Sequence, residues 1–193
     1  MDFGIVAIHF LLYFIIKIHA ARYQFFFDNE AMFDKCPHLN GSNGIHDLFD
    51  LTKLNLTYSE GSLHCSGNAT TVWDVQPSDR IELHCEVFKY ERGGWQPTVL
   101  SFTSKDFCQM QFDKNSFSYQ IWSKNIPEEE RLCVNNYGVT YHYIPFSIET
   151  IFDILVNIEG RHKVVSTFVA YENGIKPRPN KICFQYIGEF VKV

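Results

Sequence analysis

Alternation of apolar and polar residues is the feature of this sequence that most limits the folds it can adopt. Within residues 80–87 every second side chain is apolar: Ile81, Leu83, Cys85 and Val87. A period of two predicts a β-strand that buries one face. Residues 51–58 and 63–75 alternate in the same way, and segment 76–79 has the composition of a turn. We therefore expect residues 63–75 and 80–87 to pair as a β-hairpin.

Further strand-like segments, separated by turn signals, follow along the rest of the chain. They cover residues 23–27, 98–103, 139–146, 148–158, 163–171 and 181–191. Residues 107–124 differ, because Met110, Phe117 and Ile121 recur at roughly helical spacing. This spacing predicts a short helix or an irregular aromatic loop. Many short strands between turns predict an all-β sandwich.

The first twenty residues form an apolar segment that ends at small residues. His9 and Lys17 are the strongly polar interruptions of its apolar run from Ile5 to Ile18, and Ala20 and Ala21 precede polar sequence. This pattern is typical of a secretory signal peptide cleaved after Ala20. An uncleaved membrane anchor is the weaker alternative, because the stretch is short for a bilayer core. We expect a signal peptide over 1–20 and a single secreted domain over 21–193 with no membrane span.

Cysteines and glycosylation sequons all lie after that segment. The cysteines are Cys36, Cys65, Cys85, Cys108, Cys133 and Cys183. An even number behind an export signal indicates disulfides, with fifteen possible pairings. The sequons begin at Asn40, Asn55 and Asn68 and predict a glycoprotein. Asn55 and Asn68 fall on the polar faces of their expected strands, as a hydrated glycan requires.

Charge and motif content argue against several functional classes. The net charge is −5 and no basic run occurs, which argues against a nucleic-acid partner. The catalytic motifs G-x-S-x-G, H-E-x-x-H and the P-loop do not occur, and we expect neither an enzyme nor a cofactor. Zinc bound by the dipeptides His64-Cys65 and His84-Cys85 is disfavoured, because neighbours on a strand point to opposite faces. A hydrolase with a triad assembled from distant residues is an alternative left open.

Six collinear segments of the chain carry a resemblance to a known family. They are GNATTVWDVQPSDRIELHCEVF (67–88), RGGWQPT (92–98), KDFCQMQFDKNSFSYQIW (105–122), IPF (144–146), GRHKVVSTFVAYE (160–172) and RPNKICFQYIGEFVKV (178–193). Together they resemble a family of secreted insect proteins related to the chemosensory protein B group. That family is remotely similar to the ML lipid-recognition superfamily, which includes the ganglioside activator protein and the Niemann-Pick C-type cholesterol carrier. The resemblance implies an immunoglobulin-like, two-sheet antiparallel β-sandwich (ML-like) whose sheets part to hold a lipid.

The resemblance also implies how the cysteines pair. Its pattern matches this chain at Cys36, Cys108, Cys133 and Cys183, and it implies the bridges Cys108–Cys133 and Cys36–Cys183. Cys65 and Cys85 are additions relative to that pattern. Two cysteines gained on neighbouring strands suggest a third bridge between them, although a simple hairpin register would not place them directly opposite.

Aromatic residues are abundant, with 18 Phe, 10 Tyr and 3 Trp. Together with the resemblance, they lead us to expect a carrier or presenter of a small apolar ligand (a lipid, fatty acid or hydrocarbon) in a chemosensory setting. The candidate pocket residues are Phe102, Met110, Phe117, Trp122, Phe146, Phe152, Phe168 and Phe184. Ordinary core packing is the alternative role for each. The alternative function is an extracellular interaction protein with a solid core, whose surface a receptor or other protein partner reads.

Overall fold

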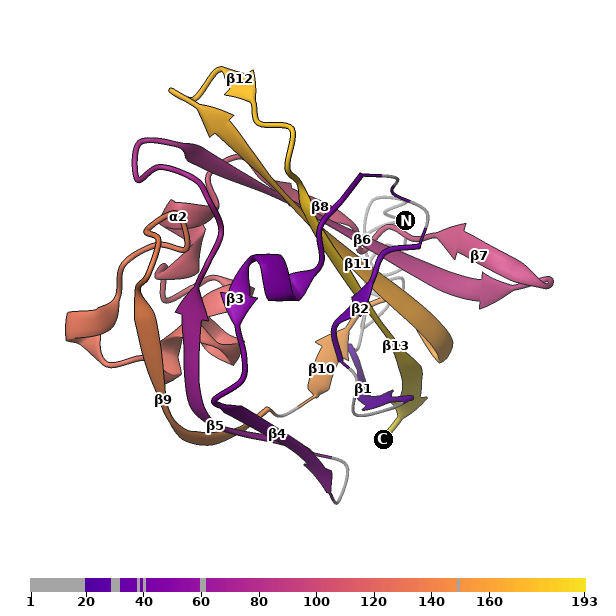
Figure 1. The fold of residues 1–193 in the computed structure, drawn as a ribbon. Helices are drawn as coiled ribbons and strands as arrows, with labels where there is room; N and C mark the ends of the chain where they lie inside the picture. The colour runs from indigo at the N-terminus through magenta and orange to yellow at the C-terminus, as the bar shows by residue number, and fades with distance from the viewer. Residues whose placement is uncertain (1–19, 29–31, 38, 40, 60–61, 149) are drawn as a thin grey trace, which may run out of the picture.

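Two antiparallel β-sheets make up the computed structural model, as expected for an all-β sandwich (Figure 1). It describes residues 20–28, 32–37, 39, 41–59, 62–148 and 150–193. The predicted signal peptide, apart from its last residue, and the Asn40 sequon lie outside the described residues. Among the helices of the described ranges, none is long and apolar enough to cross a membrane.

The larger sheet has nine strands, with the order β10-β1-β13-β11-β6-β7 along its main path. Its strands are β1 (Ala21–Phe27), β2 (Asp34–Lys35), β6 (Arg80–Glu91), β7 (Gly94–Pro97), β8 (Phe102–Ser104), β10 (Ile151–Ile154), β11 (Gly160–Glu172), β12 (Lys176–Pro177) and β13 (Ile182–Lys192). The long strands β6, β11 and β13 form its centre, where Ser166 lies between Cys85 and Phe184. Residues two apart on these strands therefore share one face across the sheet.

The smaller sheet has four strands built around β5. They are β3 (Phe49–Asp50), β4 (Leu54–Ser59), β5 (Ser62–Thr71) and β9 (Thr140–Ile148), and the short helix η1 (Ile45–Asp47) precedes them. The alternation in residues 63–71 places Leu63, Cys65 and Ala69 in the interior. Asn55 is exposed on β4, and Asn68 is half-buried on β5.

The expected hairpin between residues 63–75 and 80–87 is wrong, because β5 and β6 belong to different sheets. Residues 76–79 form the predicted turn, in which Asp79 N donates to Gln76 O at 2.8 Å, but this turn does not join paired strands. Instead, Trp73 and Val75 are buried in the main core and carry the chain from one sheet to the other. The carboxylate of Asp79 then fixes the start of β6 by binding the guanidinium of Arg178, with Nε 2.5 Å from Oδ2.

Residues 107–124 contain two short helices, so the helical interpretation of this segment is confirmed. They are α2 (Phe107–Gln111) and α3 (Phe117–Ile121), followed by the single turns η2 (Ser123–Asn125) and η3 (Glu128–Glu130). The side chain of Asp106 caps α2 by accepting from Gln109 N at 3.2 Å. Ser116 Oγ caps α3 by accepting from Tyr119 N at 3.0 Å. Figure 1 shows this helical segment beside the smaller sheet, behind β5 and β9.

Two disulfides are present, and both have the pairing that the resemblance implied. Cys36 bonds Cys183 and Cys108 bonds Cys133. The third expected bridge is wrong, because Cys65 and Cys85 are both buried, free thiols. The physical reason is the one that overturns the hairpin: Cys65 lies on β5 and Cys85 on β6, in two different sheets.

Candidate ligand cavity between the sheets

A cavity of about 520 Å³ lies between the two sheets. The inner face of the larger sheet forms one wall, through Leu83, Cys85 and Val87 of β6, Val164, Ser166 and Phe168 of β11, Phe184, Tyr186 and Phe190 of β13, and Phe25 and Phe27 of β1. These side chains share a face because each strand contributes residues two apart. The volume falls within the range of roughly 300–1,000 Å³ that is usual for small-molecule sites.

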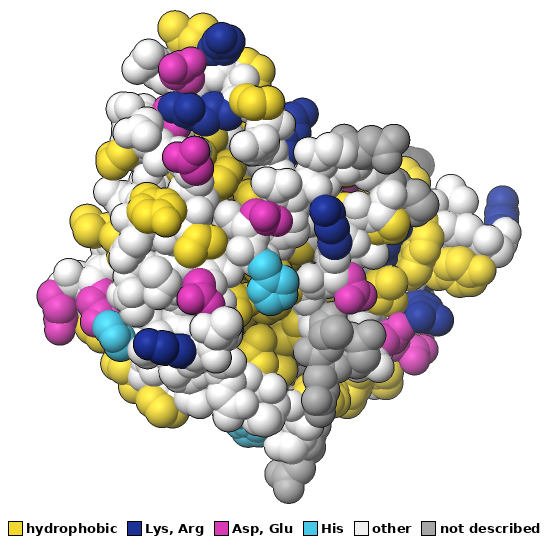
Figure 2. Space-filling view, in the orientation of Figure 1, with side chains coloured by type: hydrophobic (Ala, Val, Ile, Leu, Met, Phe, Trp, Pro, Cys, Tyr) yellow, Lys and Arg dark blue, Asp and Glu magenta, His cyan; other side chains and the backbone are white. Residues whose placement is uncertain are grey.

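The opposite wall and the cover of the cavity come from the smaller sheet and the helices. The smaller sheet contributes Leu54, Ala69, Tyr141, Tyr143 and Ile148, and the helical segment contributes Phe107, Met110, Phe117, Ile121 and Trp122. Figure 2 shows hydrophobic side chains in a hollow between the two sheets. The sandwich is therefore open enough for apolar surface to be seen from outside.

Seven of the eight candidate pocket residues lie around this one cavity: Phe102, Met110, Phe117, Trp122, Phe152, Phe168 and Phe184. Phe102 and Phe117 are 41 % and 51 % exposed, so they lie where the cavity approaches the surface. Phe146 is the exception and does not line it. Its ring packs against Trp122 and Tyr143, which line the cavity themselves, at centroid distances of 6.0 and 5.8 Å.

Several lining residues were missed from the sequence, notably Phe25, Phe27, Tyr143, Tyr186 and Phe190. The signal for two of them was present, since Tyr186 and Phe190 share the period-two face of β13 with Phe184. The residue between them on that face is Gly188. A Cβ atom there would lie 2.5 Å from Phe25 Cζ, so the missing side chain makes room for the Phe25 ring.

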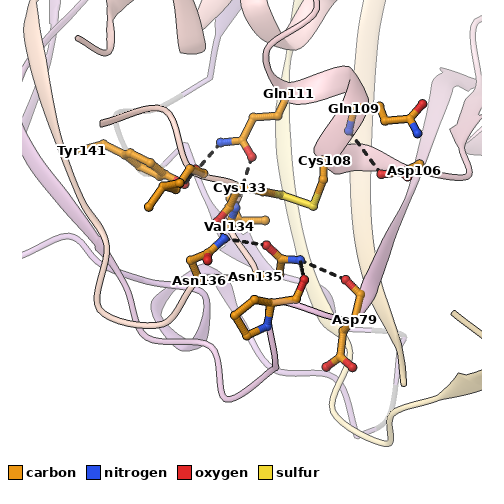
Figure 3. The surroundings of a disulfide bond; sticks show 12 residues. Asp79, Asp106, Cys108, Gln109, Gln111, Cys133, Val134, Asn135, Asn136 and Tyr141 are labelled. Carbon is orange, nitrogen blue, oxygen red and sulfur yellow. Dashed lines mark hydrogen bonds between the residues drawn. A yellow bond between two sulfur atoms is a disulfide. The ribbon is translucent and has the colours of Figure 1, made fainter. Parts of the chain in front are cut away.

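The Cys108–Cys133 disulfide ties α2 to the segment that precedes β9, and the buried amide of Gln111 ties α2 to β9 itself (Figure 3). Gln111 Nε2 donates to the Tyr141 hydroxyl at 3.4 Å, and its Oε1 accepts from Val134 N at 3.2 Å. The Tyr141 hydroxyl in turn donates to Leu132 O at 2.6 Å. Helix α2 is thus fixed by one covalent bond and by a polar side chain whose nitrogen and oxygen are both hydrogen-bonded.

The polar groups around the cavity are uncharged. They include the hydroxyls of Tyr143, Thr150, Ser166 and Tyr186 and the thiol of Cys85. Burial raises the pKa of both Tyr143 and Tyr186 above the usual range of tyrosine. Both side chains nevertheless keep some accessible surface. This combination is expected for side chains that face an internal space, with protein around them and an open side toward the cavity.

The two free thiols are expected to be unreactive, because both remain protonated at neutral pH. Burial raises the pKa of Cys65 to about 12. Burial raises the pKa of Cys85 to about 11, and a hydrogen bond with the neighbouring Ser166 partly opposes this shift. Because the thiolate is the reactive form, neither cysteine is set up as a nucleophile. Their surroundings resemble those of small apolar core residues.

No model of a known protein family and no curated protein matches this chain. The cavity and its lining therefore supply the argument about function.

Proposed function

We propose that this protein is a secreted carrier or presenter of a small apolar ligand, held between its two sheets. The observation that supports the proposal is the cavity of about 520 Å³ with an aromatic and aliphatic lining. Small-molecule sites are typically concave, mainly apolar and equipped with few polar groups. The two disulfides are compatible with an extracellular protein. The resemblance to secreted chemosensory proteins supports a role in a chemosensory fluid.

The alternative, an interaction protein with a solid core, is less well supported by the same observation. Protein interiors are close-packed and contain few voids larger than a water molecule. An apolar cavity of this size is unfavourable when it stays empty, because its lining loses dispersion contacts. A bound apolar molecule would restore those contacts.

Native mass spectrometry of the secreted, deglycosylated protein, followed by solvent extraction and lipid analysis, tests the proposal. We expect one apolar molecule per chain. A variant that fills the cavity, Ser166→Phe, should lose this ligand, because Ser166 faces the cavity from the middle of β11. Val165→Phe is the matched control, since the neighbouring residue points to the opposite face of the sheet.

The alternative outcome is equally specific. A mass without ligand that stays unchanged after incubation with fatty acids, sterols and long-chain hydrocarbons would favour the surface-recognition protein. Retention of the ligand by a folded Ser166→Phe variant would show that the molecule binds elsewhere.

A further inference from the structure

His162 is a buried histidine beside the cavity, and one of its ring nitrogens lacks a partner. The side chain is fully buried on β11, on the same face of the strand as the cavity residues Val164 and Ser166. Its Nδ1 lies 2.8 Å from Gly160 O, which can only accept, so this nitrogen carries the proton. The other nitrogen, Nε2, makes no hydrogen bond to a described residue. The geometry therefore fits a neutral ring.

The ring of His162 packs against a cluster of phenylalanines that belong to the cavity wall. Its centroid lies 5.0 Å from that of Phe190. The Phe190 ring in turn lies 4.8 Å from the Phe25 ring and 6.0 Å from the Phe152 ring. These three rings come from β13, β1 and β10, carry no charge and line the cavity. A ligand in the cavity therefore packs against the ring that His162 contacts.

A protonated His162 would find no free carboxylate within the described part of the chain. Burial lowers the pKa of His162, and the charged side chains that act on it, Lys89 and Glu91 of β6, have opposing effects. These two residues pair with each other, with Lys89 Nζ 2.9 Å from Glu91 Oε1. The chain neighbours Arg161 and Lys163 point to the opposite face of the sheet. A proton on Nε2 would therefore create a charge without a partner.

Protonation of His162 requires the packing around its ring to open. A charged group that is buried without a partner is strongly disfavoured. The cation can be solvated only if Phe190 or other side chains over it move. Such a movement displaces the cavity wall, whereas a bound ligand holds the wall in place. By thermodynamic linkage, the ligand and the proton therefore weaken each other's binding.

We propose that the folded carrier releases its ligand on acidification, with His162 as the residue that takes up the proton. One proton binds at Nε2 for each ligand molecule that leaves. The inference rests on the proposed function and adds a means of release to it. The ligand is then loaded near neutral pH and delivered where the surroundings are more acidic.

The test is the affinity of the full secreted protein for the neutral fluorescent dye N-phenylnaphthylamine at pH 7.5 and 5.5. We expect a higher Kd at pH 5.5, with a limit of about tenfold per pH unit for a single proton. His162→Asn keeps a donor for Gly160 O but cannot take up the proton, so its Kd should be equal at the two pH values. His84→Asn is the matched control and should keep the pH dependence, because His84 lies on the outer face of β6, where it pairs with Glu82 at 2.9 Å.

NMR titration of the His162 ring is a second measurement, which needs no variant at this position. Its midpoint should lie at a lower pH with the dye bound than without it, and equal midpoints would overturn the inference. A Kd that does not change with pH, or an unchanged pH dependence in a folded His162→Asn variant, would overturn it as well. So would release that accompanies loss of the near-ultraviolet circular dichroism signal, because release is proposed from the folded protein. Absence of dye binding at pH 7.5 would instead overturn the proposed function itself.

Discussion

His162 shows at the scale of one residue how the interior of this protein depends on protonation. The side chain is completely buried on β11, with its ring 5.0 Å from that of Phe190. Its Nδ1 lies 2.8 Å from Gly160 O, which it can reach only as a donor, and its Nε2 has no partner among the described residues. Burial lowers the pKa of His162, and the hydrogen bond to Gly160 only partly opposes this shift. Lys89 and Glu91 face it with opposing, smaller effects.

We predict that the protein loses stability on acidification because of this histidine. The unfolded chain binds the proton at a higher pH than the folded protein does. The stability contributed by neutral His162 is therefore complete above about pH 6.5, the ordinary histidine pKa, and is lost as the pH falls below it. The loss is at most about 1.4 kcal/mol per pH unit. Urea unfolding at pH 7.5 and 5.5 measures it.

His162→Asn should reduce the difference in unfolding free energy between the two pH values, even where the variant is less stable overall. The exposed His46→Asn variant provides the control and should keep the difference. An unchanged difference in His162→Asn would assign the acid sensitivity to other groups.

At the scale of elements, the disulfide Cys108–Cys133 decides whether the helical cover stays over the cavity. Helices α2 and α3 have five residues each, which is too short for a helix to be stable alone. We predict that Cys108→Ser with Cys133→Ser lowers the free energy of unfolding by about 3.5 kcal/mol, the value expected for a closed loop with a sequence separation of 25. Ligand binding should weaken as well, since Phe107 and Met110 line the cavity from α2.

Chemical unfolding of the double variant measures the loss of stability. Binding of the neutral fluorescent dye N-phenylnaphthylamine measures the loss of ligand affinity separately. Gln111→Ala, which removes the amide bridge but keeps the disulfide, distinguishes the contributions. Dye affinity equal to that of the unmodified protein would show that the cover holds its place without the covalent bond.

Most elements could be predicted from the sequence, but their partners could not. The alternation in residues 80–87 predicts a strand, and β6 is there. Nothing in that period says which strand lies beside it, and the adjacent β5 lies in the other sheet. The burial of Trp73 and Val75 carries the chain from β5 into the other sheet before β6 begins. This burial depends on contacts with residues distant in sequence. Strand ends were also overestimated, since β10 covers only Ile151–Ile154 of the expected 148–158.

For the molecule as a whole, aromatic abundance pointed to residues around a cavity but could not give its size. The distance between the sheets depends on which side chains meet across them. The fit of the Phe25 ring over Gly188 is one such contact, and the bonding of Gln111 to Val134 and Tyr141 is another. Such contacts join residues that are far apart in sequence, and a period-two pattern carries no information about them.

The free thiols provide a probe of how the whole molecule opens. Cys65 and Cys85 are buried with raised pKa values, so we predict that neither reacts with Ellman's reagent in the folded protein, and that both react after unfolding. Single variants Cys65→Ala and Cys85→Ala separate the two signals. If reaction needs global unfolding, a ligand at 100 times its Kd should slow both thiols about 100-fold. If local opening at the cavity suffices, Cys85, which lines it, should be protected more strongly than Cys65. Rapid reaction of either thiol without denaturant would contradict the burial of both side chains in the folded protein.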